Sequence, residues 1–263
     1  EVLPKKKVKK WKPSAKMVRV SFPKLSAKFD LTDNVVVDFD YMVKKGIRID
    51  EFLRKIKCRK MYEMHAVVFD EILFEFYKNL DTKRKDRWST SVCNQKVVIT
   101  RKDIIDFLGL EDCEDDVLLN KMNKQNLFTM LNDGFKTEVD RDVFILQFPL
   151  IVRILHKIVS ACILPKKGSK TSISIEEGKI IIGMLKGKKI DVAGKILNHS
   201  FNNKERRPYG SLIMNLLKKK KVKIPEKSFK NFPVKKFGKS NLHHMGIHVR
   251  KNIWISNDLT VYY

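Results

Sequence analysis

The chain has 263 residues, enough for one large domain or two small ones, and a folded chain of this size buries a substantial core. Hydrophobic residues make up 43% of it, which excludes a disordered or low-complexity protein. The four cysteines have neither metal-ligand nor disulfide-framework spacing, so a secreted disulfide scaffold is excluded and a reducing compartment is favoured. The net charge of +25 predicts a polyanionic partner, with nucleic acid ahead of an anionic membrane.

The positive charge is concentrated in two parts of the chain. Residues 1–60 carry 18 Lys and Arg against 7 Asp and Glu, and residues 151–263 carry 25 against 6. The middle part, 61–150, has 12 basic residues against 17 acidic ones. Lysines that served only solubility would be spread more evenly, so the two basic parts are the expected contacts to a polyanion.

The first elements in chain order are a basic arm, a strand and two helices. Residues 1–18 are rich in lysine and show no apolar periodicity, which predicts a flexible basic arm. Residues 31–39 have the composition of a short strand. Helical spacing of apolar residues predicts an amphipathic helix over 47–60, and a run that is apolar on most of its circumference predicts a core helix over 65–80.

A hairpin and a capped helix follow. The β-prone runs Trp88–Cys93 and Lys96–Ile99 are predicted to pair. Thr100 and Asp103 have the spacing of a capping box, which opens a helix that Gly109 ends after Leu108.

The next part of the chain is predicted to be helical after an acidic, solvated turn at 111–116. Pro149 suits the first turn of a long helix, and Ser174 with Glu177 forms a second capping box. The predicted helices are 117–131, 149–163, 175–186, 192–201 and 209–220.

The C-terminal residues are predicted to contain strands. Residues 226–263 form a basic extension whose alternating apolar residues predict a β-hairpin with its turn at Asn257-Asp258. The fold class is therefore mainly α with minor β (α+β), with about seven helices around one core and one or two short β-hairpins. A single domain over 19–225 lies between the arm at 1–18 and the extension at 226–263.

No membrane-spanning segment is predicted. The longest apolar stretch, Val143–Leu164, contains Arg153 and Lys157, each of which costs about 3 kcal/mol at the centre of a bilayer. Pro149 also lies within it. A buried core helix is the better interpretation of this stretch.

Four segments resemble a known family. They are FEFYKNL (74–80), VVITRKDIIDFLGL (97–110), LHKIVSACILPKKGSKTSISIEEGKIIIGMLKGKKIDVAGKILNHSF (155–201) and PYGSLIMNLLKKKKV (208–222). In order and spacing they are similar to the putative plant transposon protein domain, found in Athila-type and envelope-like reading frames of plant LTR retroelements. Arg153 departs from that pattern, which has an aromatic residue ahead of the long helix. The resemblance implies a retroelement origin and brings no catalytic or binding residues with it.

Two basic features are candidate functional sites. The first has the composition and spacing of a nuclear localisation signal, which a nuclear import receptor reads as an extended chain; its lysines are Lys5, Lys6, Lys7, Lys9 and Lys10. The second is a basic surface that would contact phosphates, and more lysines gather at its centre than complementing a helix dipole requires. Its candidates are Lys186, Lys188, Lys189, Arg206, Arg207, Lys218, Lys219, Lys220, Lys221 and Lys223.

Neither a metal site nor a catalytic site is predicted. His243, His244 and His248 lack the nearby Cys or carboxylate ligand that a zinc site needs. The carboxylates of 111–116 come from one loop, whereas two-metal enzymes collect theirs from separate elements. No nucleophile or phosphate-loop motif is present, so we expect a protein that is not an enzyme and needs no cofactor.

Two functional hypotheses follow from the sequence. In the first, the domain binds RNA or DNA in the nucleus through phosphate contacts that do not depend on base sequence. In the second, it is a protein–protein interaction or assembly domain of a retroelement protein, with no direct contact to nucleic acid. Both hypotheses are compatible with a monomer and with an oligomer.

Overall fold

The computed structural model describes residues 35–121, 123–132, 145, 148–166, 172–224, 231–232, 235–245, 247–250, 253–256 and 261–262. The predicted basic arm at 1–18, with all five lysines of the import signal, lies outside the described residues. So does the predicted turn at Asn257-Asp258.

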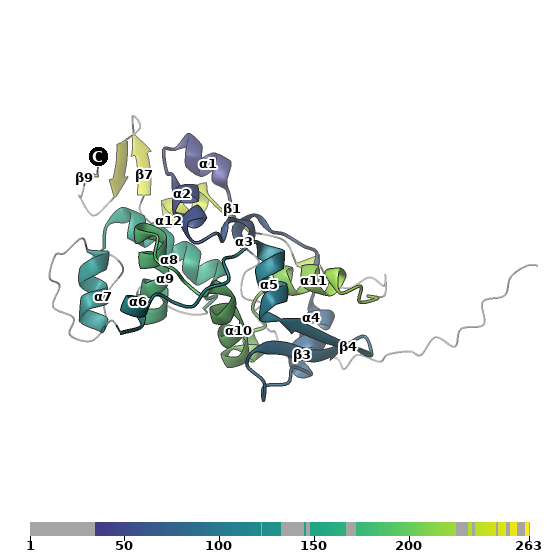
Figure 1. Ribbon diagram of the computed structural model, residues 1–263. Helices are drawn as coiled ribbons and strands as arrows, with labels where there is room; N and C mark the ends of the chain where they lie inside the picture. Colours follow the sequence, from purple (N-terminus) through teal and green to yellow (C-terminus); the bar gives the residue numbers. More distant parts are fainter. Residues whose placement is uncertain are drawn as a thin grey trace, which may run out of the picture.

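Helices dominate the described residues and strands are few and short (Figure 1), which confirms the predicted fold class. There are twelve α-helices within the described ranges instead of about seven, because predicted helices are divided and two short ones have no clear sequence pattern. The helices are α1 (Phe39–Lys44), α2 (Ile49–Lys55), α3 (Arg59–Glu63), α4 (Asp70–Lys78), α5 (Arg101–Leu108), α6 (Val117–Lys121), α7 (Lys124–Leu131), α8 (Leu150–Cys162), α9 (Ile175–Lys186), α10 (Val192–Asn202), α11 (Gly210–Lys219) and α12 (Lys239–His244), with a 3₁₀ turn η2 (Lys204–Arg206).

The strands form four small sheets. They are β1 (Val35–Val37), β2 (Val68–Phe69), β3 (Arg87–Val92), β4 (Gln95–Thr100), β5 (Asn231–Phe232), β6 (Lys235–Phe237), β7 (Ile247–Arg250), β8 (Ile253–Ser256) and β9 (Val261–Tyr262). β1 pairs with β6 in parallel, and β2 pairs with β5, β3 with β4, and β8 with both β7 and β9 in antiparallel fashion. The β8–β9 pair confirms the strands of the predicted C-terminal hairpin.

The β3–β4 hairpin is the longest pairing and also confirms its prediction. Six residue pairs run from Arg87↔Thr100 to Val92↔Gln95. The two turn residues, Cys93 and Asn94, have φ of 50° and 60°. A two-residue turn with positive φ at both positions matches the right-handed twist of the strands it joins.

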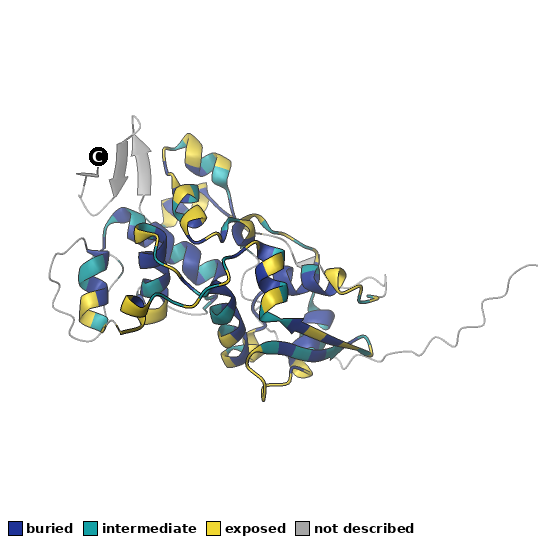
Figure 2. Ribbon diagram, in the orientation of Figure 1, coloured by how far each residue is buried: buried dark blue, intermediate teal, exposed yellow. Residues whose placement is uncertain are grey.

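The buried apolar side chains form one core, in which α8 packs against α9, and α9 also packs against α2 and α7. α8 is buried around nearly its whole circumference, as expected for a central helix. Figure 2 shows α9 and α10 mainly buried and α1 mainly exposed. α9 approaches α7 closely, because a Cβ on Gly178 would lie 2.4 Å from Cδ2 of Leu127. Among the described helices, none combines the length and the apolar composition that crossing a bilayer requires.

Both predicted capping boxes are present and start their helices where expected. The Thr100 hydroxyl accepts from the Asp103 amide, and an Asp103 carboxylate oxygen accepts from the Thr100 amide. Ser174 and Glu177 exchange the same two bonds. The helices opened in this way end at Gly109 and Gly187, each in the left-handed region that favours glycine.

Three predicted helices are wrong in their extent. The helix over 47–60 is divided into α2 and α3. The division follows from the left-handed backbone of Lys57, with φ of 51°, which ends α2, and the buried Cys58 is then the N-cap of α3. The helix over 65–80 begins only at Asp70, since Val68 and Phe69 pair with β5 as a strand. The helix over 117–131 is divided at Asn123, which is extended and caps α7 by accepting from the Asn126 amide.

Part of the basic extension belongs to the folded domain. Residues 235–237 form β6 beside β1, and residues 239–244 form α12. Phe237 and Leu242 are each 2% exposed and lie in the hydrophobic core. The folded unit therefore continues past 225, the predicted end of the domain.

Candidate nucleic-acid interface

The ten residues of the predicted basic surface lie in three different places. Lys186 ends α9 and Lys188 and Lys189 follow it, Arg206 and Arg207 lie at η2, and the remaining five lie at the end of α11 and just after it. Figure 1 draws α9 and α11 on opposite sides of α10. The structure therefore divides the ten residues among three places and does not bring them together into one surface.

The first group is paired with the acidic loop. Lys188 lies with Nζ 3.4 Å from Oδ2 of Asp116, and Lys189 lies with Nζ 3.3 Å from Oε1 of Glu111. Glu111 is also 3.3 Å from Lys57 Nζ, and the two lysines hold the pKa of Glu111 below its ordinary value. The loop at 111–116 is thus not the freely solvated turn that its composition predicts, since its carboxylates neutralise lysines assigned to the basic surface.

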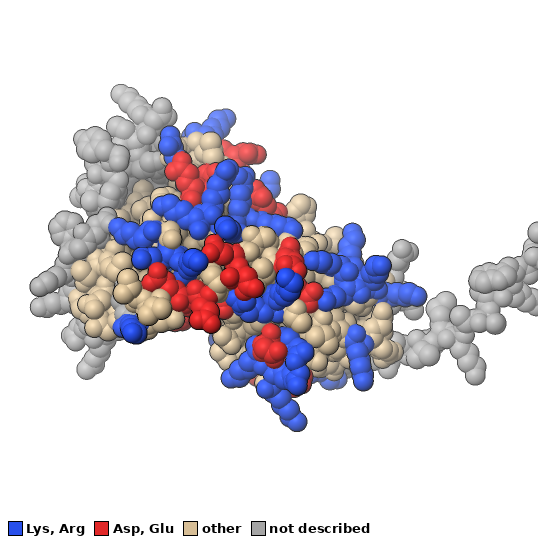
Figure 3. Space-filling model, in the orientation of Figure 1, with Lys and Arg blue, Asp and Glu red and all other residues tan. Residues whose placement is uncertain are grey.

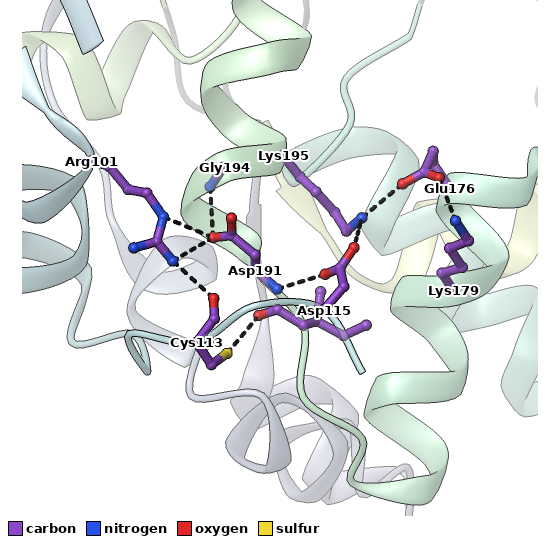
Figure 4. A network of polar contacts seen from close by, with 9 residues as sticks. Arg101, Cys113, Asp115, Glu176, Lys179, Asp191, Gly194 and Lys195 are labelled. Carbon is purple, nitrogen blue, oxygen red and sulfur yellow. Dashed lines mark hydrogen bonds and ion pairs between the residues drawn. The ribbon is translucent and has the colours of Figure 1, made fainter. Parts of the chain in front are cut away.

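The same loop is bound to the start of α10 through Arg101, the first residue of α5 (Figure 4). The Arg101 guanidinium donates to Oδ1 of Asp191 from both Nε and Nη2, at 3.2 and 2.9 Å. It also donates to the Cys113 carbonyl and pairs with Asp112. Asp191 accepts in addition from the Gly194 amide, as the N-cap of α10. One guanidinium therefore joins three elements.

Asp115 completes this network from the other side (Figure 4). Its two carboxylate oxygens accept from the Asp191 amide at 2.7 Å and from Lys195 Nζ at 2.6 Å. Lys195 donates as well to Glu176, which also accepts from Lys179. Burial by itself would lower the pKa of the Lys195 ammonium, but hydrogen bonds and attraction from Asp115 and Glu176 outweigh it and raise that pKa.

We call these paired residues the acidic clamp. Its members are Lys57, Arg101, Glu111, Asp112, Asp115, Asp116, Lys188, Lys189, Asp191 and Lys195. Because each of its carboxylates already faces a cation, the clamp fastens the loop at 111–116 to α5, α9 and α10 and offers no free metal ligands. Within the described ranges, no group of three or more His, Cys, Asp and Glu side chains could hold a metal ion.

In the second group, Arg207 is a correction to the sequence prediction. It is 2% exposed, pairs with Asp70 at the start of α4, and lies with its Cζ 5.3 Å from the centre of the Phe74 ring. Burial lowers the pKa of its guanidinium. A side chain in this position fastens η2 to α4 and is not available to an external phosphate, whereas its neighbour Arg206 is exposed.

The third group contains lysines that have no carboxylate partner. Lys218, Lys219, Lys221 and Lys223 are exposed and form no ion pair with any described residue. Lys220 differs, because its Nζ lies 2.8 Å from Oδ1 of Asp103. Burial raises the pKa of that carboxyl, but Lys220 and Thr100 bind it and bring its pKa below the ordinary value.

The chain after α11 is fixed to the β3–β4 hairpin. The Gln95 side-chain amide donates to the Lys223 carbonyl and accepts from the Lys223 amide, both at 3.2 Å. This places Lys223 at the residue that precedes Lys96 of β4, and Lys96 is also exposed and has no ion-pair partner among the described residues. Sequence reasoning missed Lys96, because its relation to Lys223 depends on a contact across 128 positions.

We call this surface the lysine edge and define it as Lys96, Lys218, Lys219, Lys221 and Lys223. Figure 3 shows Lys and Arg side chains gathered at the right, where Figure 1 places the end of α11. In the acidic clamp, by contrast, red and blue side chains alternate. The lysine edge is therefore the part of the predicted surface that keeps its positive charge uncompensated.

A buried polar cluster lies between α8 and α9, next to the Lys195–Glu176 pair. Glu177 accepts from Lys166 Nζ and from the Ser174 hydroxyl, each at 2.8 Å, and its Oε1 is 3.4 Å from Nε2 of His156. Burial raises the pKa of Glu177, but His156, Lys166 and Ser174 outweigh it and bring that pKa to about 2. Ser174 donates to Glu177 as part of the capping box of α9, and a carboxylate with a pKa of about 2 is a weak base toward that hydroxyl.

An open cavity of about 470 Å³ borders this cluster. Its polar lining includes His199, whose Nε2 lies 2.9 Å from the Pro165 carbonyl while Nδ1 lies 3.4 Å from Nδ2 of Asn203. Burial lowers the pKa of this imidazole, so near neutral pH it is uncharged, donating through Nε2 and accepting at Nδ1. Both nitrogens are engaged within the protein, as expected of a structural histidine.

Comparison with models of protein families, with curated proteins and with solved structures finds no match for this chain. The resemblance to the plant transposon protein domain therefore stays a prediction made from the sequence.

Proposed function

We propose that this protein binds nucleic acid through the lysine edge, by phosphate contacts that do not depend on base sequence. The observation that carries the proposal is a positive charge that no acidic residue compensates. The five lysines of the lysine edge have no carboxylate partner among the described residues, whereas Lys188 and Lys189 of the same predicted surface are paired. Lysines that lie close together without acidic partners attract polyanions most strongly.

Phosphate binding of this kind has a measurable signature. Each lysine that neutralises a duplex phosphate releases a condensed counterion, so the logarithm of affinity falls with the logarithm of salt concentration at about −0.9 per contact. Five contacts from the lysine edge give a slope of about −4.5.

The experiment compares two variants that lose the same charge. In the first, Lys218, Lys219, Lys221 and Lys223 become Gln; in the control, the surface lysines Lys44, Lys45, Lys121 and Lys239 become Gln. Electrophoretic titrations at several salt concentrations should show weaker binding of every sequence by the first variant, and a slope flatter by about 3.6. The control should keep nearly the whole slope. Equal affinity and equal slope in the wild type and the first variant would contradict the proposal.

We also propose that the lysines from Lys5 to Lys10 direct the protein to the nucleus through a nuclear import receptor. A fluorescent fusion of residues 1–18 to a carrier too large for passive entry should accumulate in the nucleus. Replacing Lys5, Lys6 and Lys7 with Ala should return it to the cytoplasm, because the receptor needs their charge. A carrier that stays cytoplasmic with the intact segment would exclude this signal.

We propose, further, that the domain derives from a plant retroelement and acts without catalysis. Supporting the second point, Asp115 and Asp116 pair with lysines and are not directed at a shared ion position. Nuclease assays in Mg²⁺ and Mn²⁺ should show no cleavage; cleavage abolished by Asp115→Asn with Asp116→Asn would overturn this. Long terminal repeats flanking the gene are the expected mark of its origin.

The alternative, an assembly domain, has weaker support. Among the described residues, the large exposed apolar side chains lie on different parts of the fold, apart from two that are adjacent in α6. They are Val43, Val67, Val98, Val117, Leu118 and Ile175. Light scattering across a range of protein concentrations tests for self-association directly.

A further inference from the structure

One face of the β3–β4 hairpin is covered only in part by the described residues. Arg87, Ser89 and Ser91 alternate with buried residues along β3, and the register sets Ser89 opposite Val98 and Ser91 opposite Lys96. Apart from Val98, the side chains named on this outer face are small or basic, and they follow the right-handed twist of the two-stranded ribbon.

The opposite face of the hairpin is held firmly by the core. Trp88 is buried and its indole nitrogen donates to the Ser200 hydroxyl at 2.6 Å, while the Thr90 hydroxyl donates to the Phe76 carbonyl at 2.7 Å. The segment after α4 runs along the free edge of β3, where the Asp81 amide donates to the Ser89 carbonyl at 2.8 Å. These bonds hold the hairpin in place against the core, so the position of its outer face is fixed.

Positive charge lies at both ends of this ribbon. The lysine edge meets the ribbon at the end with the Cys93-Asn94 turn, where Lys223 is bonded to Gln95 and Lys96 follows in β4. At the other end, the loop before β3 exposes Lys83, Arg84 and Lys85, which have no ion-pair partner among the described residues. Two acidic residues share that loop, Asp81 and Asp86, and Asp86 lies 3.3 Å from Arg87. Figure 3 shows blue side chains both at the α11 end and below the hairpin, as drawn in Figure 1.

The dimensions match the major groove of B-form DNA. Six residues per strand give a ribbon about 17 Å long. The major groove is about 12 Å wide and admits a two-stranded ribbon, as in the β-ribbon class of DNA-binding proteins. A ribbon that crosses the groove places its two ends at the two phosphate backbones, where this protein carries its uncompensated cations.

We propose that the polymer bound is double-stranded DNA and that the β3–β4 ribbon lies in its major groove, with the lysine edge on one phosphate backbone and Lys83, Arg84 and Lys85 on the other. This rests on the proposed function and names its substrate class. Duplex RNA does not fit, because its major groove is too deep and narrow for side chains to enter. Single strands bind by stacking on aromatic rings, and the outer face of the ribbon has none.

The first experiment compares four polymers of equal length with the wild-type protein. They are duplex DNA, duplex RNA, single-stranded DNA, and duplex DNA whose major groove is filled by glucosylated 5-hydroxymethylcytosine. Unmodified duplex DNA should bind at least about tenfold more tightly than each of the others, because the other three lack an accessible major groove of B-form width. Equal binding of the glucosylated duplex would overturn the inference, as would a preference for single strands.

The second experiment uses a matched pair of variants. Val98→Glu places a carboxylate in the middle of the outer face, and Val43→Glu makes the same change on α1, which is far from the hairpin in Figure 1; the two valines are 43% and 59% exposed. Val98→Glu should lower duplex affinity about tenfold, since like charges would then face each other at close range. Val43→Glu should change it less than twofold. Circular dichroism shows whether both variants are folded, and equal affinities of two folded variants would contradict the ribbon placement.

The two proposals can fail separately. If the Gln variant of the lysine edge loses binding while all four polymers bind alike, phosphate contact stands and the major-groove inference is lost. If no polymer binds the wild-type protein at low salt, both are lost.

Discussion

The acidic clamp and the lysine edge are built from the same kind of residue and have opposite consequences. In the clamp, the Lys195 side chain is 10% exposed and pairs with both Asp115 and Glu176. These two ion pairs neutralise its charge and hold α10 to the loop at 111–116 and to α9. At the lysine edge, Lys218 and Lys219 point into solvent with no carboxylate partner within the described ranges. A Lys-rich sequence alone does not distinguish the two. The position of the acidic residues in the fold does, because it decides which lysines are already neutralised.

The largest expected effect is on the stability of the fold and concerns Glu177. Like the carboxylates of the clamp, Glu177 is paired with cationic side chains, here Lys166 and His156. Its pKa of about 2 lies below the ordinary value of 4.5, so its ionised form stabilises the fold at pH above 4.5, and this stabilisation is lost as the pH falls toward 2. The contribution is on the order of 3 kcal/mol. Urea unfolding from pH 7 to pH 2 should show it, and Glu177→Gln should remove both that stability and its pH dependence. Exposed Glu114→Gln is the control.

A second prediction compares one substitution in the two regions. Lys195→Met leaves Asp115 and Glu176 without their shared cation, and should lower the free energy of unfolding by about 2 kcal/mol, or the melting temperature by roughly 4–8 °C. Lys219→Met removes an unpaired surface charge and should change stability by less than about 0.5 kcal/mol. Calorimetry of the two variants measures both. Similar melting temperatures would mean that the clamp does not stabilise the fold.

The smallest expected effect comes from releasing the lysines of the clamp. Glu111→Gln with Asp116→Asn frees Lys57, Lys188 and Lys189, and should raise duplex affinity about threefold and steepen its salt dependence. The control, Glu114→Gln with Asp40→Asn, removes the same charge from exposed residues that form no ion pair in the described ranges. If both double variants bind alike, compensation by carboxylates is not what separates the two regions.

Local signals in the sequence predicted much of the fold. The capping boxes at Thr100 and Ser174 and the glycines that end their helices involve residues three to thirteen positions apart, and all four are present. The points at which the predicted helices over 47–60 and 65–80 are interrupted were not predicted, because no local sequence signal marks them. The apolar spacing of 47–60 continues across Lys57, and β2 depends on a partner about 160 positions away.

The candidate site was predictable only in part, for the same reason. The run from Lys218 to Lys223 is visible as composition, whereas the burial of Arg207 depends on Asp70, 137 positions earlier. Nothing near Lys188 and Lys189 in the sequence indicates that the loop at 111–116 neutralises them. The net charge of a segment predicts where a basic surface lies. Which of its charges remain without an acidic partner depends on how the chain folds.

The parallel pairing of β1 with β6 also bears on how the chain is synthesised. Val35–Val37 emerge from the ribosome about 200 residues before Lys235–Phe237, their partners in the sheet. The early strand cannot form this pairing until about 200 further residues have been made. A nascent chain stalled at about residue 225 would hold folded helices but lack Phe237 and Leu242 in its core, and should be cleaved by added protease more readily than one stalled after α12.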